Sequence, residues 1–198
     1  VDIVREIRHN KIVTPLVLMG YYNPLLAYGV SRFTRDAAEA GADGLIVVDL
    51  PPEEAGETRA ACAGAGLDFI PLVAPTSSDE RLELAGKSGS GFVYCVSVRG
   101  VTGVREQLPD DLEALVGRVR RHSSGLPIAV GFGISQREHV EVVGHYADAA
   151  VIGSAIVRLL AEAPPAERYA RVKAYMEQVI GVKAQKVPDK GQGRREVR

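Results

Sequence analysis

The sequence predicts an α/β fold in which parallel strands alternate with helices. Short apolar runs rich in Val, Ile and Leu are separated by longer amphipathic stretches, which is typical of parallel strands joined by right-handed crossovers. The runs are continuously apolar rather than alternating, so both faces of each strand are expected to be covered, as in a barrel or a doubly wound sheet. Because 46% of the 198 residues are hydrophobic, one domain with a substantial core is expected.

Six apolar runs are predicted to be the strands, at residues 14–19, 44–49, 69–74, 91–96, 127–132 and 149–153. Helices are predicted over residues 31–40, 52–65, 79–87, 110–122, 136–145 and 165–180. Ser31 and Ser135 stand where an N-cap hydroxyl would accept free amides of a first helical turn. Gly41 and Gly66 are expected to end helices. Both glycines lie in an Ala-Gly-x-Asp junction before a strand, a weak repeat that favours β/α units.

The two ends of the chain differ from the middle. Residues 1–7 do not begin with methionine and have apolar side chains spaced three and four apart, which predicts the middle or end of an amphipathic helix. A further N-terminal segment is therefore expected before Val1. Residues 1–182 are expected to form the domain. Residues 183–198 are polar and lack an apolar period, so a disordered tail is expected there.

Composition argues against several function classes. A net charge of -1 gives no electrostatic footprint for a nucleic acid or an anionic membrane surface. No apolar run reaches the roughly 18 to 20 residues of a membrane span. Cys62 and Cys95 stand far apart, so neither a disulfide framework nor a zinc site is expected, and a reducing cytoplasm fits best. The histidines fall on predicted helices or their ends, so no metal site is expected.

Glycine turns at the ends of the last two predicted strands indicate a phosphate site. Gly131-Phe132-Gly133 ends the fifth strand, and Gly153-Ser154 ends the sixth. Glycines let the backbone approach a ligand closely, and amides that open a helix attract an anion. Barrels of eight β/α units often bind phosphate after strands 7 and 8, which implies that two strands precede this chain. The alternative is that these glycines only permit tight strand-to-helix turns.

Several motifs together resemble one known family. They are Tyr94-x-x-Ser97-x-x-Gly100-Val101-Thr102-Gly103, Gly131-Phe132-Gly133-Ile134-Ser135, Gly153-Ser154-Ala155-Ile156-Val157, Leu18-Met19-Gly20-Tyr21-Tyr22-Asn23-Pro24-Leu25 and Val48-Asp49-Leu50-Pro51-Pro52-Glu53-Glu54. In this order they resemble the tryptophan synthase α chain. The resemblance implies a (β/α)8 TIM barrel, represented here by roughly strands 3–8.

The resemblance also implies an activity and partners. The family is a lyase that cleaves indole-3-glycerol phosphate to indole and glyceraldehyde 3-phosphate by a retro-aldol step in tryptophan biosynthesis. The family α chain needs no cofactor, and pyridoxal phosphate is expected only on a partner β chain in an α2β2 heterotetramer.

Site residues follow from the same resemblance. Phosphate binding is expected of Gly103, Gly133, Gly153 and Ser154, and substrate binding of Tyr21, Tyr94 and Phe132. Thr102 is expected to help in a loop that closes over the ligand. Proton transfer suits carboxylates with tuned pKa values, and the family glutamate and aspartate are expected upstream of Val1, so no catalytic residue is assigned to this chain. Asp49, Asn23 and Pro51 are expected to organise loops and signal between subunits.

Two alternatives remain open. Another phosphate-binding TIM-barrel enzyme of amino-acid or sugar-phosphate metabolism would share the fold and the phosphate site, so the fold alone does not discriminate. A catalytically inactive, truncated α chain that only binds a β chain would use the apolar segment at residues 22–26 and Leu50-Pro51-Pro52 as its surface. The full-length family member is expected to be a lyase, whereas this chain alone is expected to be inactive.

Overall fold

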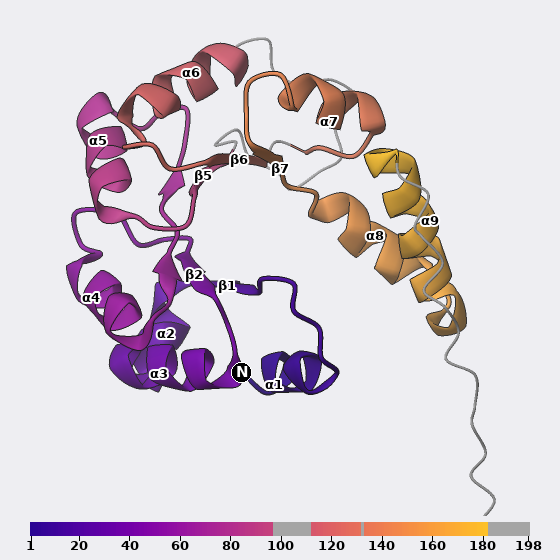
Figure 1. The fold of residues 1–198 in the computed structure, drawn as a ribbon, viewed down its shortest axis with the longest axis horizontal. Coiled ribbons are helices and arrows are strands. Elements are labelled where there is room, and N and C mark those ends of the chain that lie inside the picture. The colour runs from indigo at the N-terminus through magenta and orange to yellow at the C-terminus, as the bar shows by residue number, and fades with distance from the viewer. Residues whose placement is uncertain (97–111, 132, 182–198) are drawn as a thin grey trace, which may run out of the picture.

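The computed structural model describes residues 1–96, 112–131 and 133–181, and its helices and strands alternate along the chain (Figure 1). The helices are α1 Asp2–His9, α2 Tyr22–Tyr28, α3 Val30–Ala40, α4 Gly56–Ala65, α5 Asp79–Ser88, α6 Leu112–His122, α7 Arg137–Val143, α8 Ser154–Glu162 and α9 Arg168–Ile180, with a 3-10 turn η1 at Pro165–Glu167. The strands are β1 Val17–Gly20, β2 Gly44–Val47, β3 Asp68–Phe69, β4 Leu72–Val73, β5 Val93–Val96, β6 Ile128–Gly131 and β7 Ala149–Ala150.

All pairs of neighbouring strands are parallel, as the sequence predicts. One sheet has the order β1-β2-β3 and the other β4-β5-β6-β7. The third predicted run is divided into β3 and β4 because it changes partner midway. The Ile70 amide donates to Leu45 of β2, whereas the Pro71 carbonyl accepts from Tyr94 of β5. Proline has no amide hydrogen to donate, so the ladder breaks at this point while the strand continues in space.

Each predicted helix is present, but the helix predicted over residues 52–65 begins at Gly56, and residues 165–167 of the last one form a 3-10 turn. The sequence did not predict α2 or α8, and the apolar segment at residues 22–26 lies within α2. Gly41 and Gly66 end α3 and α4 with left-handed backbone, as expected. The predicted N-caps are wrong. Ser31 lies inside α3, whose N-cap is Gly29, and Ser135 precedes Gln136, the N-cap of α7.

The strands lie on the inside of a curved arrangement and the helices lie outside (Figure 1). In this view the ring is open between α1 and the α8–α9 pair. Strand β1, which is the edge strand of its sheet, lies at this opening. Its side chains are partly exposed, Val17 at 37% and Met19 at 56%. Strands β5 and β6, in contrast, are covered by α5, α6 and α7, and their buried side chains include Val93, Cys95, Ile128 and Val130.

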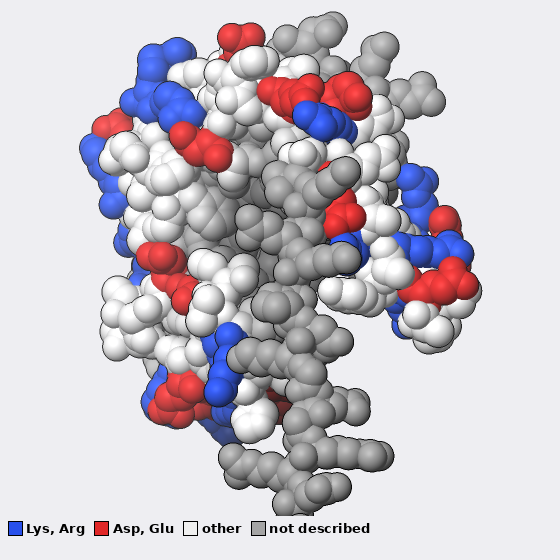
Figure 2. Space-filling view, turned by 45° about the vertical axis from the view of Figure 1, so that its right-hand side comes forward, with Lys and Arg blue, Asp and Glu red and all other residues white. Residues whose placement is uncertain are grey.

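The described surface has mixed charge and no transmembrane helix. In the face seen in Figure 2, acidic and basic side chains are interspersed. Several described ion pairs lie within one helix, such as that of Arg137 with Glu141 at 2.7 Å. Within the described residues, no helix is long and apolar enough to cross a bilayer.

Helices α5 and α6 approach each other closely because α5 has a glycine at the contact. A Cβ atom placed on Gly86 would overlap the carbonyl oxygen of His122 and lie 2.9 Å from the carbonyl carbon of Ser123. Both obstacles are backbone atoms, which cannot rotate away as a side chain could. Gly86 therefore sets the distance between the two helices.

Replacing Gly86 by alanine is expected to destabilise the fold. Overpacking at this contact should lower the free energy of unfolding by about 1–3 kcal/mol, measured by urea denaturation. Gly64→Ala is the matched control, because Gly64 also lies near the C-terminal end of its helix but has open space where a Cβ would stand. That variant should be neutral or stabilising by about 0.5–1 kcal/mol. Equal effects of the two substitutions would contradict this account of the contact.

Candidate active site

The carboxyl ends of β5, β6 and β7 meet at one edge because the three strands are parallel. Cys95 pairs with Val130 in the ladder, and Val130 pairs with Ala150. The described segments that follow β6 and β7 therefore begin at the same end of the sheet. In open or closed parallel sheets this is the edge where ligands bind.

Tyr94 of β5 provides a flat, uncharged ring next to this edge. The side chain is half-buried, and this burial raises the pKa of the phenol above its ordinary value. The hydroxyl group therefore remains protonated at neutral pH and can donate a hydrogen bond. A Cβ on Gly131 would lie 2.8 Å from the Tyr94 ring carbon Cε2, so the ring occupies this position because residue 131 is a glycine.

The turn after β6 and the start of α8 provide backbone amides. Gly133 has a φ of +74°, a left-handed conformation that favours glycine. Gly153 is the N-cap of α8, and a Cβ there would meet open space. The first intrahelical hydrogen bond of α8 is donated by Ile156 to the Gly153 carbonyl at 3.0 Å. The amides of Ser154 and Ala155 precede that bond and have no partner within the helix, so they can bind an anion.

Three of the predicted site residues fall outside the described residues. They are Thr102, Gly103 and Phe132. Tyr21 is described, as the N-cap of α2 directly after β1, and its side chain is 64% exposed. The structure thus brings together the strand and turn ends that carry Tyr94, Gly133, Gly153 and Ser154, whereas Tyr21 belongs to the separate sheet of β1.

Asp49 connects the segments that follow β1 and β2. Its Oδ1 atom accepts a hydrogen bond from the Tyr22 amide at 2.7 Å, which holds the start of α2. Asn23, on the same helix, is exposed. A pocket of about 350 Å³ lies beside this contact, and Asp49, Pro51, Ser77 and Arg81 are among its lining residues. The carboxylate of Asp49 is therefore engaged in holding backbone.

An ion pair that the sequence did not predict joins the loop after β2 to the first turn of α5. Arg81 Nε lies 2.7 Å from Glu53 Oε1. The pKa of Glu53 is lowered, first by its own backbone amide and then by Arg81. Arg81 is placed by an N-cap, since its amide donates to Ser78 Oγ at 3.4 Å. The Ser-Asp-Glu order at residues 78–80 is a typical helix start and could have located the N-terminal turn of α5, where Arg81 lies.

The histidines do not form a metal site within the described residues. No group of three or more His, Cys, Asp or Glu side chains converges there. His139 is buried in α7, and its Nδ1 accepts from the Ser135 amide at 3.4 Å. That contact is a structural one, which supports the start of α7.

Comparisons with known proteins identify relatives over most of the chain. The family model described as tryptophan synthase alpha chain matches residues 1–186. A tryptophan synthase alpha chain of Roseiflexus sp. (strain RS-1) is 49% identical over 91% of this chain and 69% of its own length. A tryptophan synthase of Saccharomyces cerevisiae is 48% identical over 96% of this chain, which spans only 27% of the yeast protein.

Solved structures give the same result. The tryptophan synthase α2β2 complex from Pyrococcus furiosus contains a chain that matches with a TM-score of 0.84 and 39% identity, over 91% of this chain and 72% of that one. A mutant alpha-subunit from the same organism matches with a TM-score of 0.82 and 38% identity. The fold is therefore that of these alpha-subunits over the matched part, as the sequence predicts.

The two cysteines are expected to be inert while the chain is folded. Cys62 and Cys95 are fully buried, and burial raises their thiol pKa values to about 11 and about 12. At pH 8 roughly one thiol in a thousand or fewer would be a thiolate, the reactive form. A colorimetric thiol reagent at pH 8 should therefore label neither cysteine in native buffer and both in urea. Fast labelling of the native protein would contradict the burial of these groups.

Proposed function

Because the chain belongs to the tryptophan synthase alpha chain family, we propose that the protein cleaves indole-3-glycerol phosphate to indole and glyceraldehyde 3-phosphate. The observation that supports this best is the pair of glycine turns after β6 and β7, with the free amides of α8 beside them. A phosphate held there would place the rest of the substrate towards the Tyr94 ring. This arrangement suits a substrate with an anionic end and a flat aromatic end.

Two groups of residues bind different parts of the substrate in this proposal. Gly103, Gly133, Gly153 and Ser154 bind the phosphate, and Tyr21, Tyr94 and Phe132 line the indole and glycerol pocket. Thr102 belongs to the loop that closes over the ligand. Binding energy from the phosphate, which does not react, can then be used to orient the bond that breaks.

The chemical step needs groups that move protons. A glycerol hydroxyl loses its proton and becomes the aldehyde carbonyl as the carbon–carbon bond breaks, and C3 of the indole gains a proton. Carboxylates perform such general acid–base work. Asp49 is not assigned to it, because its Oδ1 atom already accepts the Tyr22 amide. Asp49, Asn23 and Pro51 organise the loops and carry the signal between subunits, and no carboxylate of this chain is assigned to the proton transfer.

The partner in this proposal is a tryptophan synthase β chain in an α2β2 assembly. Pyridoxal phosphate belongs to that β chain, and the cleavage itself uses no cofactor. The exposed side of α2 supports such a contact, since Leu26 is 53% and Tyr28 42% exposed while the neighbouring Leu25 is buried. Two unpaired, buried cysteines fit a reducing cytoplasm as the place of work.

Substituting Gly153 by aspartate tests the phosphate site without harming the helix. The carboxylate of an aspartate at this N-cap can accept hydrogen bonds from the first amides of α8. The melting temperature of the protein should therefore be unchanged or slightly raised. Its charge should weaken binding of indole-3-glycerol phosphate roughly a hundredfold or more, because two like charges about 4 Å apart repel by about 4 kcal/mol near a protein surface. Titration calorimetry on the intact gene product measures the affinity of the unsubstituted protein and of the variant for the substrate.

The control for that experiment is Gly153→Asn, which has the same shape and no charge. It should weaken binding much less than the aspartate. Undiminished binding by Gly153→Asp would remove the phosphate assignment, and with it the main support for the cleavage reaction.

A charge on α2 tests the partner surface. Leu26→Asp should lower the affinity for a tryptophan synthase β chain roughly tenfold or more, because burying an unpaired carboxylate in an interface is costly. Val142→Asp is the matched control, since Val142 on α7 is similarly exposed, at 46%. Surface plasmon resonance with immobilised β chain gives both affinities. If Leu26→Asp bound as tightly as the control, α2 would not belong to the interface.

A further inference from the structure

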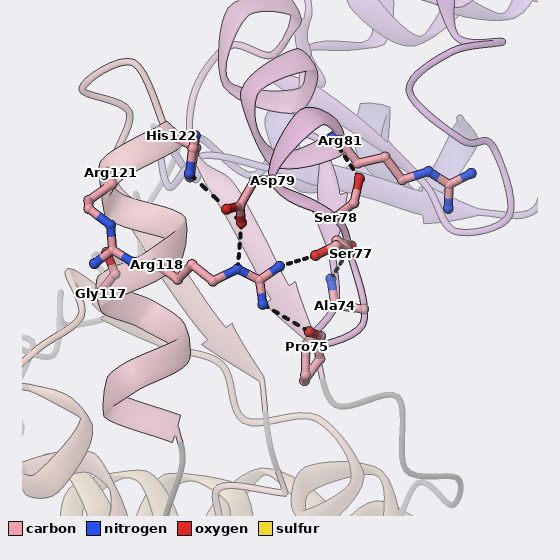
Figure 3. A network of polar contacts seen from close by, with 10 residues as sticks. All are labelled: Ala74, Pro75, Ser77, Ser78, Asp79, Arg81, Gly117, Arg118, Arg121 and His122. Carbon is pink, nitrogen blue, oxygen red and sulfur yellow. Dashed lines mark hydrogen bonds and ion pairs between the residues drawn. The ribbon is translucent and has the colours of Figure 1, made fainter.

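Arg118 on α6 holds the segment that follows β4 by three separate hydrogen bonds (Figure 3). Its Nε donates to Asp79 Oδ1 at 2.8 Å, and its Nη1 donates to the Pro75 carbonyl at 3.3 Å. Its Nη2 donates to the Ser77 carbonyl. The planar guanidinium group thus binds two backbone carbonyls and one carboxylate at once, a geometry that a lysine cannot reproduce.

The segment held in this way is a tight turn with its own internal hydrogen bonds. The Ser77 amide donates to the Ala74 carbonyl at 2.9 Å, and the Ala74 amide donates to Ser77 Oγ at 3.1 Å. Asp79 is the first residue of α5, after the N-cap Ser78. Its Oδ1 atom also lies 3.9 Å from His122 Nε2. The turn is therefore held both by hydrogen bonds between its own residues and by hydrogen bonds from Arg118.

This turn lies at the ligand-binding edge of the sheet. It directly follows β4, whose residues Leu72 and Val73 pair with Tyr94 and Cys95 of β5. Ser77 also lines the pocket of about 350 Å³ together with Asp49. A shift of the turn would thus displace its neighbours, which are the strand that carries Tyr94 and the loop that Asp49 organises.

We propose that Arg118 is a positioning residue for the cleavage reaction, which acts by fixing residues 74–78 at the carboxyl end of β4. This role rests on the proposed function. Among the described residues Arg118 binds Asp79, Pro75 and Ser77 and no residue of the turns after β6 and β7. Its loss should therefore disturb the orientation of the reacting part of the substrate more than the binding of the phosphate. Misplacement of reacting groups by about 1 Å is sufficient to cost up to a hundredfold in rate.

The test uses the intact gene product with a β chain, and the variants Arg118→Met, Arg118→Lys and Asp79→Asn. Arg118→Met should lower kcat for cleavage of indole-3-glycerol phosphate roughly ten- to hundredfold. The affinity for inorganic phosphate, measured as inhibition of the same reaction, should change less than about twofold. Arg118→Lys should recover only part of the loss, and the effects of Asp79→Asn and Arg118→Met should not add, because the two side chains share one contact.

Arg121→Met is the matched control. Arg121 lies on the same helix, and its Nη1 donates to the Gly117 carbonyl, at 3.2 Å, within that helix (Figure 3). Its substitution should leave kcat unchanged. The role of Arg118 is overturned if Arg118→Met has the same kcat as Arg121→Met. It is also overturned if phosphate affinity and kcat fall in parallel in Arg118→Lys, since that pattern indicates general damage to the fold. Absence of cleavage by the unsubstituted protein would instead overturn the proposed function, and this role with it.

Discussion

The register of the parallel strands depends on aspartates at their amino ends that accept backbone and arginine donors together. Asp43, before β2, accepts the Leu16 amide and Arg8 Nη2 through one oxygen, both at 2.6 Å. Asp148, before β7, accepts the Ile128 amide at 2.8 Å and an arginine of α6 at 3.0 Å. The Ile128 amide is the main reason that the pKa of Asp148 is lowered. Each carboxylate thus locks one strand to its neighbour and to a covering helix.

A fixed amino end has a consequence at the opposite end of the sheet. Strands held in register end at the same level, so the loops that follow them can contact one another. Those contacts are also polar and also use arginine or aspartate. Asp49 holds the start of α2, Glu53 pairs with Arg81, and Arg118 holds the turn after β4. The register of the strands therefore determines which of the loops that follow them can contact one another.

Much of the fold could be predicted from the sequence because apolar runs and Ala-Gly-x-Asp junctions are local signals. The missed helix α2 has a physical explanation. Asn23-Pro24 is typical of a turn, but proline is tolerated in a first helical turn, where its missing amide hydrogen costs nothing. The start of α8 after Gly153 lacks a polar cap that would mark it. Contacts such as that of Arg118 with Pro75 join residues 43 positions apart, and no local pattern contains that information.

The site separates tasks between the two kinds of contact. In the proposed function, phosphate binding would use backbone amides at glycines, which need correct strand register but few particular side chains. Orientation of the reacting end would use side chains such as Tyr94, whose place depends on Gly131 and on the neighbouring turn. Amides fixed by the sheet would bind the phosphate strongly without themselves helping the chemical step. On this proposal the rate depends on the segments that side chains such as Arg118 hold in place, because there the binding energy orients the reacting groups.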